Sequence, residues 1–273
     1  MNFDVMEWSN LLLRWVHVFV GIMWVGTTYY FTWLDGRFTE LEKALSNPQD
    51  KQREPEDKIV WMVHSGGFYR VEKLRVPRVM PEKLHWFRWE AALTWLSGFV
   101  LLGLVYYHGG LMVDLEGARI SAGAAIALSI GSMILGWAAY DLLWSSRLFA
   151  NEKVGVAVSY GLVVAMTCVL FRFLAARAAC IQLGAIFGTI MAANVWMRIL
   201  PAQRRMVAAL KQGQEPDQAE ALRAKTRSKH NTFIVIPVVF LMLSNHFPGT
   251  YHWITVSLLV LAGWATAKFV RRA

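Results

Sequence analysis

The chain has 273 residues, of which 56% are hydrophobic and 13 are Trp, and its mean hydropathy is +0.36. This composition is too apolar for an ordinary soluble enzyme, and the apolar residues fall in runs long enough to cross a bilayer. The formal net charge of +9 would suit a nucleic-acid partner, so its distribution along the chain decides how it is interpreted.

Hydropathy predicts an all-α fold, a polytopic membrane bundle of seven transmembrane helices within a single integral-membrane domain, residues 1–273. The spans are expected at residues 10–34, 89–108, 121–144, 155–174, 178–200, 230–247 and 252–269. Only residues 175–177 join the fourth and fifth spans, so we expect these two helices to be antiparallel neighbours. No cleavable signal peptide is expected, because the first ten residues contain no basic residue.

Two connections are long enough to carry structure of their own. Residues 36–87 begin with a charged helical pattern and continue as IVWMVHSGGFYRVEKLRV, two alternating runs around Ser65-Gly66-Gly67. This pattern predicts a β-hairpin at the membrane surface. Residues 201–229 predict a short polar helix, or a pair of helices interrupted near residues 213–216.

The basic residues are concentrated in alternate connections. Residues 36–87, 145–154, 201–229 and 268–273 contain 22 Lys and Arg, whereas residues 1–10, 109–120, 175–177 and 248–251 contain 2. The positive-inside rule therefore predicts the N terminus outside, the C terminus inside and a cytoplasmic hairpin. The charge is explained by topology, which excludes nucleic-acid binding as its cause.

Four histidines are expected near the outer face: His17 within the first span, His246 at the end of the sixth, and His108 and His252 near the interface. Facing histidines of a helical bundle can hold a haem b, so His17 and His246 are predicted axial ligands, with His108 and His252 as weaker candidates. Alternatively, these histidines only make hydrogen bonds and the glycines below His17 serve helix packing. No Cys-x-x-Cys-His motif is present, so no covalent c-type haem is expected, and the two cysteines are predicted packing residues.

A second polar set is expected near the cytoplasmic face. Its members are Asp35, Glu90, Asp141, Asn194, Arg198, His230 and Asn231. One interpretation is structural, because Asp141 or Glu90 paired with Arg198 would make these charges tolerable inside a membrane. The other is a pocket for a planar, anionic substrate rich in nitrogen and oxygen, since guanidinium and amide groups pair with such edges.

Five segments resemble a known family. They are HVFVGIMWVGTTYYFTWLD from His17, VHSGGFYRVEK from Val63, WFRWEAALTWLSG from Trp86, AANVWMRILPAQRRMV from Ala192 and KHNTFIVIPVVFLMLSNHFP from Lys229. They are similar to the membrane domain of the bacterial membrane-bound urate oxidase (urate hydroxylase) family. The resemblance implies a multi-pass protein of the bacterial inner membrane that oxidises urate to 5-hydroxyisourate and reduces a c-type cytochrome. Full-length members of that family carry a C-terminal cytochrome c domain, and no haem-attachment motif is found here. The resemblance therefore implies either a separate cytochrome as partner or a relative with another task.

Taken together, these patterns predict a substrate site formed by Asn194, Arg198, Asn231 and His64, with His230, Glu90 or Asp141 accepting the proton. Electrons would then move outward to the haem b. Two rival interpretations remain open at this stage. One is a haem-b electron-transfer subunit of a larger membrane complex with no substrate of its own, and the other is a transporter or copper-handling permease.

Overall fold

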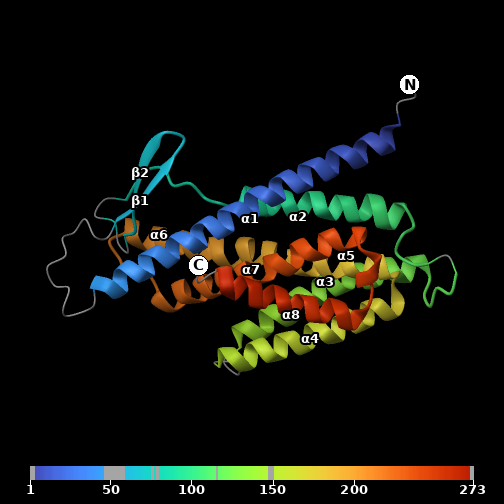
Figure 1. Cartoon of the computed structure of the whole chain (residues 1–273). Coiled ribbons are helices and arrows are strands. Elements are labelled where there is room, and N and C mark those ends of the chain that lie inside the picture. Colours follow the sequence, from blue (N-terminus) through green and yellow to red (C-terminus); the bar gives the residue numbers. More distant parts are fainter. Residues whose placement is uncertain are drawn as a thin grey trace.

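The computed structural model describes residues 4–45, 59–74, 77, 80–114, 116–146 and 151–270, which form a helical bundle with one two-stranded sheet (Figure 1). The long helices are α1 (Val5–Leu45), α2 (Trp89–Leu101), α3 (Ala122–Ser145), α4 (Glu152–Phe173), α5 (Ala176–Ala193), α6 (Leu200–Lys211), α7 (Gln218–Leu243) and α8 (Trp253–Val270). Two π-helical segments, η3 (Leu102–His108) and η5 (Asn194–Ile199), continue α2 and α5, and two 3-10 turns, η6 (Ser244–His246) and η7 (Pro248–Thr250), join α7 to α8. The predicted helical fold class is confirmed.

Six stretches of the described chain are long and apolar enough to cross a membrane. They are Val5–Ala44, Trp89–His108, Ala122–Ser145, Glu152–Phe173, Ala176–Lys211 and Trp253–Val270. Each contains or closely matches a predicted span. The predicted span at 230–247 lies in α7, whose first half is polar and whose second half is apolar. That second half buries Ile234, Val235 and Leu241 in the core shared with α5 and α8.

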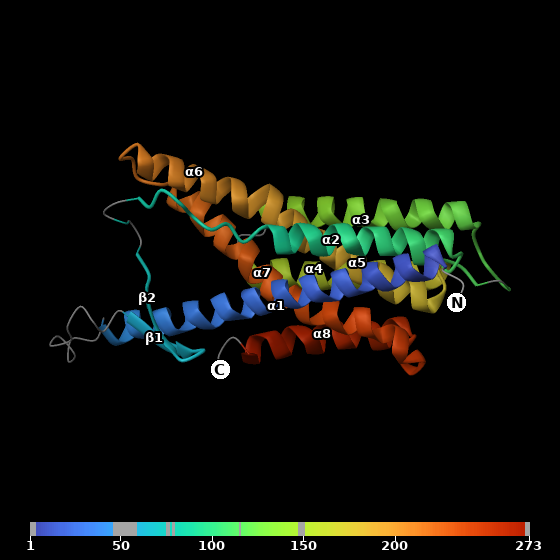
Figure 2. The same ribbon diagram turned by 90° about the horizontal axis from the view of Figure 1, so that it is seen from above.

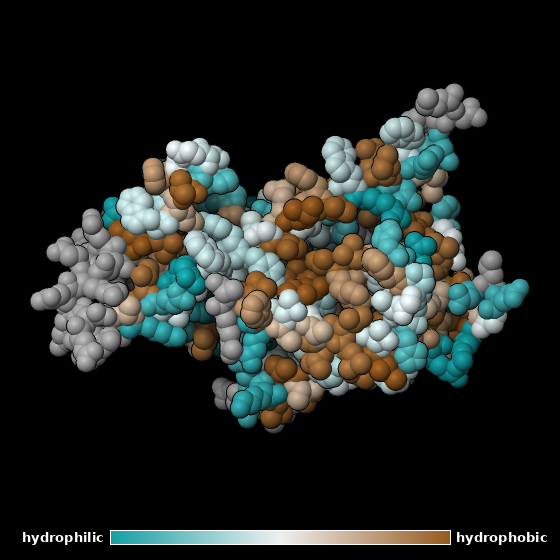
Figure 3. Space-filling view, in the orientation of Figure 1, coloured by the Kyte–Doolittle hydropathy of each residue, from teal (hydrophilic) through white to brown (hydrophobic). Residues whose placement is uncertain are grey.

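The surface of the bundle is that of a membrane protein. Large apolar side chains are exposed on several helices, among them Trp15 and Ile22 of α1, Leu135 of α3 and Leu258 of α8. Figure 3 shows apolar residues gathered over the middle of the visible face and hydrophilic residues at its two ends. Lipid tails would cover the apolar belt, because an exposed apolar surface of this extent is unfavourable in water.

Helix α5 lies at the centre of the bundle and contacts α2, α3, α4 and α7. Its residues from Ala178 to Ala192 are mostly buried, which explains why this span contains many small residues. A Cβ atom added to Gly136 of α3 would lie 2.7 Å from Ile186 Cγ2 of α5, so these helices approach as closely as glycine allows. The contact between α4 and α5 agrees with the antiparallel pair expected from their short link.

The two ends of the bundle carry different connections. The N terminus and the α7–α8 turn lie at one end, and the hairpin, the α6–α7 turn and the C-terminal end of α8 lie at the other (Figures 1 and 2). The connections with many basic residues are therefore gathered at one end. Residues 46–58, 75–76, 78–79, 147–150 and 271–273 of these predicted connections lie outside the described residues.

The predicted hairpin is confirmed as β1 (Ile59–His64) paired antiparallel with β2 (Gly67–Glu72). Ser65 and Gly66 form its two-residue turn, both with positive φ (49° and 75°), which is typical of a type I′ turn. One face of the hairpin packs through Val60 against Leu34 and Phe38 of α1. These contacts explain why α1 continues beyond the predicted end of its span at residue 34. The apolar stripe of the helix goes on and is covered by the hairpin.

The connection at 201–229 forms two helical segments, as predicted. Helix α6 ends at Lys211, Gly213 adopts a φ of 70°, and α7 begins after the N-cap Asp217. Arg205 of α6 pairs with Glu220 of α7, and the hydrogen bond from the guanidinium lowers the pKa of the Glu220 carboxyl. This exposed pair joins α6 and α7 side by side at the basic end of the bundle.

Candidate functional site

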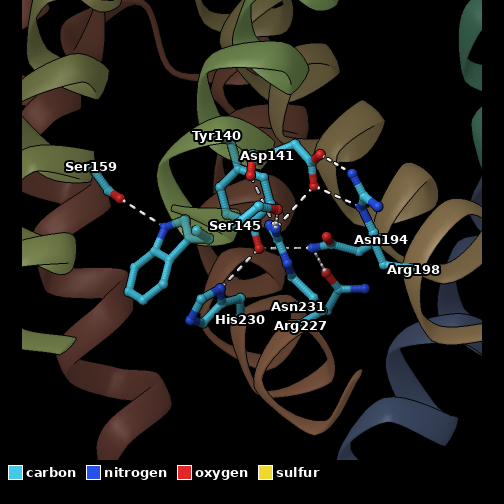
Figure 4. A network of polar contacts seen from close by, with 10 residues as sticks. Tyr140, Asp141, Ser145, Ser159, Asn194, Arg198, Arg227, His230 and Asn231 are labelled. Carbon is cyan, nitrogen blue, oxygen red and sulfur yellow. Dashed lines mark hydrogen bonds and ion pairs between the residues drawn. The ribbon is translucent and has the colours of Figure 1, made fainter. Parts of the chain in front are cut away.

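A cluster of polar side chains, most of them buried, lies where α3, η5 and α7 meet (Figure 4). We call it the inner cluster. Its members are Tyr140, Asp141 and Ser145 of α3, Asn194 and Arg198 of η5, and Arg227, His230 and Asn231 of α7. The π-helical turn brings Asn194 and Arg198 to the same side of their helix, and such turns are frequent at functional sites.

Asp141 holds the two arginines of the cluster. Its Oδ1 accepts hydrogen bonds from Arg198 Nε and Arg227 Nη2, both at 2.9 Å, and its Oδ2 pairs with Arg198 Nη2. Arg227 also donates to Ser145 Oγ at 3.0 Å and lies over the Tyr140 ring, 4.8 Å from its centroid. The Arg227 side chain is only 6% exposed, whereas that of Arg198 is 46% exposed. Asp141 therefore neutralises a deeply buried cation.

A chain of hydrogen bonds connects the other members. Asn231 Nδ2 donates to the Met191 carbonyl oxygen at 3.1 Å, and Asn194 Nδ2 donates to Asn231 Oδ1 at 2.9 Å. Asn194 Nδ2 also donates to the Tyr140 hydroxyl at 3.0 Å, and that hydroxyl lies 2.8 Å from His230 Nδ1. All four side chains are buried, so the chain of bonds is shielded from water.

Three buried polar atoms of the inner cluster have no hydrogen-bond partner among the described residues. They are Asn194 Oδ1, Arg227 Nη1 and His230 Nε2. A buried polar atom without a partner costs about 1–3 kcal/mol, so three of them in one cluster require an explanation. A bound ligand with matching donors and acceptors is one such explanation.

The formal charge of the inner cluster is also unbalanced. Arg198 and Arg227 contribute two positive charges and Asp141 one negative charge, so one positive charge remains if His230 is neutral. Lys229 does not add to the excess, because its ammonium pairs with the Glu152 carboxylate. An excess of one positive charge, shared between the buried Arg227 and the half-exposed Arg198, favours an anionic ligand.

The inner cluster contains five of the predicted site residues: Asp141, Asn194, Arg198, His230 and Asn231. The structural pairing predicted for Arg198 with Asp141 is present as well. Glu90 lies nearby but outside the cluster, in the first turn of α2, which packs on η5 through Ala91 and Val195. Its half-buried carboxylate makes no hydrogen bond or ion pair within the part of the chain that the structure describes. His64 is not brought to the cluster, since it is exposed beside the hairpin turn.

Sequence reasoning missed Arg227 and Tyr140. Arg227 belongs to the basic connection before the sixth predicted span, yet it lies three residues before His230 and therefore on the same helix face. Tyr140 precedes Asp141, and an aromatic residue in an apolar helix gives no signal by itself. The spacing of Arg227, His230 and Asn231 could have identified Arg227 as a site residue. Nothing in the sequence distinguishes Tyr140 from other aromatic residues of the helices.

A surface cavity of about 580 Å³ lies at the start of α4, lined by Asn151, Glu152, Lys153 and Val156. Trp144 of α3 packs against this part of α4. The Trp144 indole packs against Gly155 on one side and lies 4.2 Å from the His230 ring on the other, and its Nε1 donates to Ser159. The indole therefore covers the side of His230 that faces α4.

The predicted outer histidines lie in different surroundings. His17 is half-buried against α2, with Nδ1 at 3.0 Å from the Thr94 carbonyl oxygen and 3.1 Å from Ser97 Oγ. Gly98 makes room for the ring, because a Cβ atom there would lie 2.8 Å from His17 Cε1. His246, His108 and His252 are exposed at helix ends, and His252 Nδ1 accepts a hydrogen bond from the Ile254 backbone nitrogen.

Comparison with known proteins adds one finding to this geometry. Residues 4–273 match the family described as urate oxidase N-terminal, which is nearly the whole chain. No curated protein and no solved structure matches the chain significantly. This match covers the helical bundle and the inner cluster together. The chain therefore belongs to the urate oxidase N-terminal family.

Proposed function

We propose that this protein oxidises urate to 5-hydroxyisourate at the inner cluster and passes the electrons through a haem b to a c-type cytochrome. The family assignment supports a urate-related oxidoreductase in a membrane. We further propose seven spans with the N terminus outside and the inner cluster toward the cytoplasm of a bacterial inner membrane. The gathering of basic connections at one end of the bundle and the opposite positions of the termini support this topology.

The unpaired positive charge of the inner cluster is the observation that carries the proposal. Urate is a planar monoanion at neutral pH, with carbonyl oxygens and ring N–H groups around its edge. Arg227 Nη1 is a buried donor with no partner among the described residues. Asn194 Oδ1 is a buried acceptor that also has no partner among them. A guanidinium can pair with an anionic edge and an amide oxygen can accept from a ring N–H, so the cluster complements this ligand.

The proposed reaction adds water to C5 of urate and removes two electrons and two protons. A group near the cluster must accept a proton. Asp141 is poorly suited, because both of its carboxylate oxygens already accept hydrogen bonds from guanidiniums. Glu90 is better suited, since its carboxylate is half-buried, lies next to η5 and has no pairing among the described residues. We therefore assign the role of proton acceptor to Glu90.

His17 would suit a haem b as one of its protein ligands. A carbonyl oxygen can only accept, so the contact with Thr94 places the hydrogen on His17 Nδ1 and leaves the lone pair on Nε2. A ring held in this way is the usual arrangement of a metal-binding histidine. His246 is the proposed second ligand. When bound, a haem b would take electrons one at a time and pass them to the cytochrome.

Gly98→Ala is expected to lower the haem content of the purified protein to less than half that of the wild type. The added methyl group would collide with the His17 ring and turn Nε2 away from the iron. The haem content is measured from the visible spectrum per mole of folded protein. Gly103→Ala is the matched control, because a Cβ atom there meets nothing within 4 Å. Full haem content in a folded Gly98→Ala protein would argue against His17 as a ligand.

The visible spectrum of the purified protein, recorded with dithionite and then with urate as the only reductant, tests the proposed function. A b-type spectrum that urate reduces is the expected result. A b-type spectrum that urate leaves oxidised would overturn urate oxidation and favour an electron-transfer subunit. A folded protein without haem, after purification in the presence of added haem, would overturn the proposed electron path.

A further inference from the structure

We infer that His230 presents its Nε2–H to the substrate as a hydrogen-bond donor, and that Tyr140 is the positioning residue that keeps the hydrogen there. This inference rests on the proposed function and adds to it the direction of one contact between site and substrate. It also removes His230 from the predicted proton acceptors, because the lone pair of the ring is on Nδ1 and already accepts the hydrogen bond from Tyr140.

The direction of the hydrogen bonds is set by a backbone group. The Met191 carbonyl oxygen can only accept, so the atom of Asn231 that faces it is the amide nitrogen. The other terminal atom of Asn231 is therefore an oxygen, and it needs a donor. Asn194 supplies that donor through Nδ2, which fixes the orientation of the Asn194 amide in turn.

The same Asn194 nitrogen also faces the Tyr140 hydroxyl, 3.0 Å away. An amide nitrogen can only donate, so the Tyr140 oxygen is the acceptor in this contact. The single hydrogen of that hydroxyl is then free to point toward His230 Nδ1, at 2.8 Å. No other acceptor for this hydrogen lies within reach among the described residues, so Tyr140 donates and His230 Nδ1 accepts. The hydrogen of the neutral ring is then on Nε2.

His230 Nε2 points away from this chain of bonds, as Figure 4 shows for the ring nitrogen opposite Tyr140. It is buried and has no partner among the described residues. The atom it requires is an acceptor, such as a carbonyl oxygen or a deprotonated ring nitrogen of an anionic purine. The cost of leaving this donor unpaired is removed only when such a ligand is bound, which gives the contact its selectivity.

The alternative, in which His230 is the proton acceptor, needs a free lone pair on the ring. A lone pair on Nε2 would place the ring hydrogen on Nδ1, and the Tyr140 oxygen would then accept from both His230 and Asn194. The hydrogen of the Tyr140 hydroxyl would be left buried, with no acceptor among the described residues. The hydrogen-bond directions therefore favour binding over proton transfer as the role of His230.

Two amide substitutions separate these roles, because each resembles one nitrogen of the ring. The Gln amide of His230→Gln can place an N–H near the position of Nε2, whereas the shorter amide of His230→Asn reaches only the position of Nδ1. Urate binding is measured by calorimetry without an electron acceptor, and kcat and KM are measured across pH with one present. We expect Kd and KM of His230→Gln to stay within about tenfold of the wild type, and those of His230→Asn to rise by more than tenfold.

Tyr140→Phe tests the positioning role. Loss of the hydroxyl allows the His230 ring to take either neutral form, so we expect Kd for urate to rise about threefold to tenfold with little change in the pH profile of kcat. Tyr107→Phe is the matched control. It removes a hydroxyl that bonds to Ser129 in another part of the bundle, and we expect it to leave Kd unchanged.

Failure of this inference is distinguishable from failure of the proposed function. If the wild type neither binds nor oxidises urate, the proposed function is wrong. If the wild type binds urate but His230→Asn binds as well as or better than His230→Gln, the donor assignment is overturned. If both variants bind urate normally and lose kcat together with one limb of the pH profile, His230 is the proton acceptor and the inference is overturned.

Discussion

Asp141→Asn is expected to lower the free energy of unfolding by about 3–5 kcal/mol. The substitution removes the only negative charge of the inner cluster and leaves two guanidiniums facing a neutral amide. Arg227 is the more sensitive of the two, because its side chain is 6% exposed and cannot turn to water. Its Nη2 would keep Ser145 Oγ as an acceptor, but its charge would remain buried and unpaired.

Thermal unfolding of the detergent-solubilised protein measures this effect, with Lys73→Ala as the control. Lys73 pairs with Asp35 at 2.5 Å, but both side chains are about half exposed, so its loss should cost no more than about 1 kcal/mol. The double variant Asp141→Leu/Arg227→Met should recover most of the stability, because it removes both buried charges. A single Asp141→Asn protein as stable as the wild type would show that Arg227 is not dependent on this carboxylate.

Asn194→Asp is expected to weaken urate binding by a factor on the order of a hundred. The two side chains have almost the same shape, so the change acts through charge. A carboxylate at this position cancels the excess positive charge of the inner cluster and repels an anionic ligand. It also replaces the donor to Tyr140 and Asn231 with an acceptor, which reverses the chain of hydrogen bonds that ends at His230.

Calorimetric titration with urate measures this change, and Gln182→Glu is its control. Gln182 is also fully buried on α5 and also hydrogen-bonded, but to Ser129 and Ser132 of a separate polar group. The control adds the same charge to the same helix and should change stability more than urate affinity. Equal losses of affinity in the two variants would point to general damage and against a urate site at Asn194.

Local patterns were sufficient to predict most of the secondary structure. The alternating runs around Ser65-Gly66-Gly67 predicted the hairpin, and the structure pairs Val63 with Phe68 and His64 with Gly67 across it. The lengths of the apolar runs predicted the helices, since a bilayer requires a minimum span. The charged helical pattern predicted from residue 36 is the last part of α1, which ends at Leu45. Hydropathy could not predict that this part packs against the hairpin, because that contact joins two separate segments.

The candidate site was predicted in part. Asn194, Arg198, His230 and Asn231 stand out because polar residues are costly inside a membrane and need a reason to be there. His64 satisfied the same chemical criteria, yet the hairpin turns it away from the cluster. Tyr140 did not stand out, because an aromatic residue within an apolar helix usually packs in the core.

The amino-acid sequence by itself determined the composition of each helix, the position of its polar residues along the axis and the distribution of basic charge between the two ends. These features depend on neighbours within one turn or one span, and so they can be read from local spacing. Only the tertiary structure decided which helix faces meet. Asp141 pairs with both Arg198 and Arg227 because three separate segments, α3, η5 and α7, pack together there. The same packing sets the direction of the hydrogen bonds that lead from Met191 to His230. Pairing of this kind depends on the rotation and the close approach of the helices, which spacing along a single helix leaves undetermined.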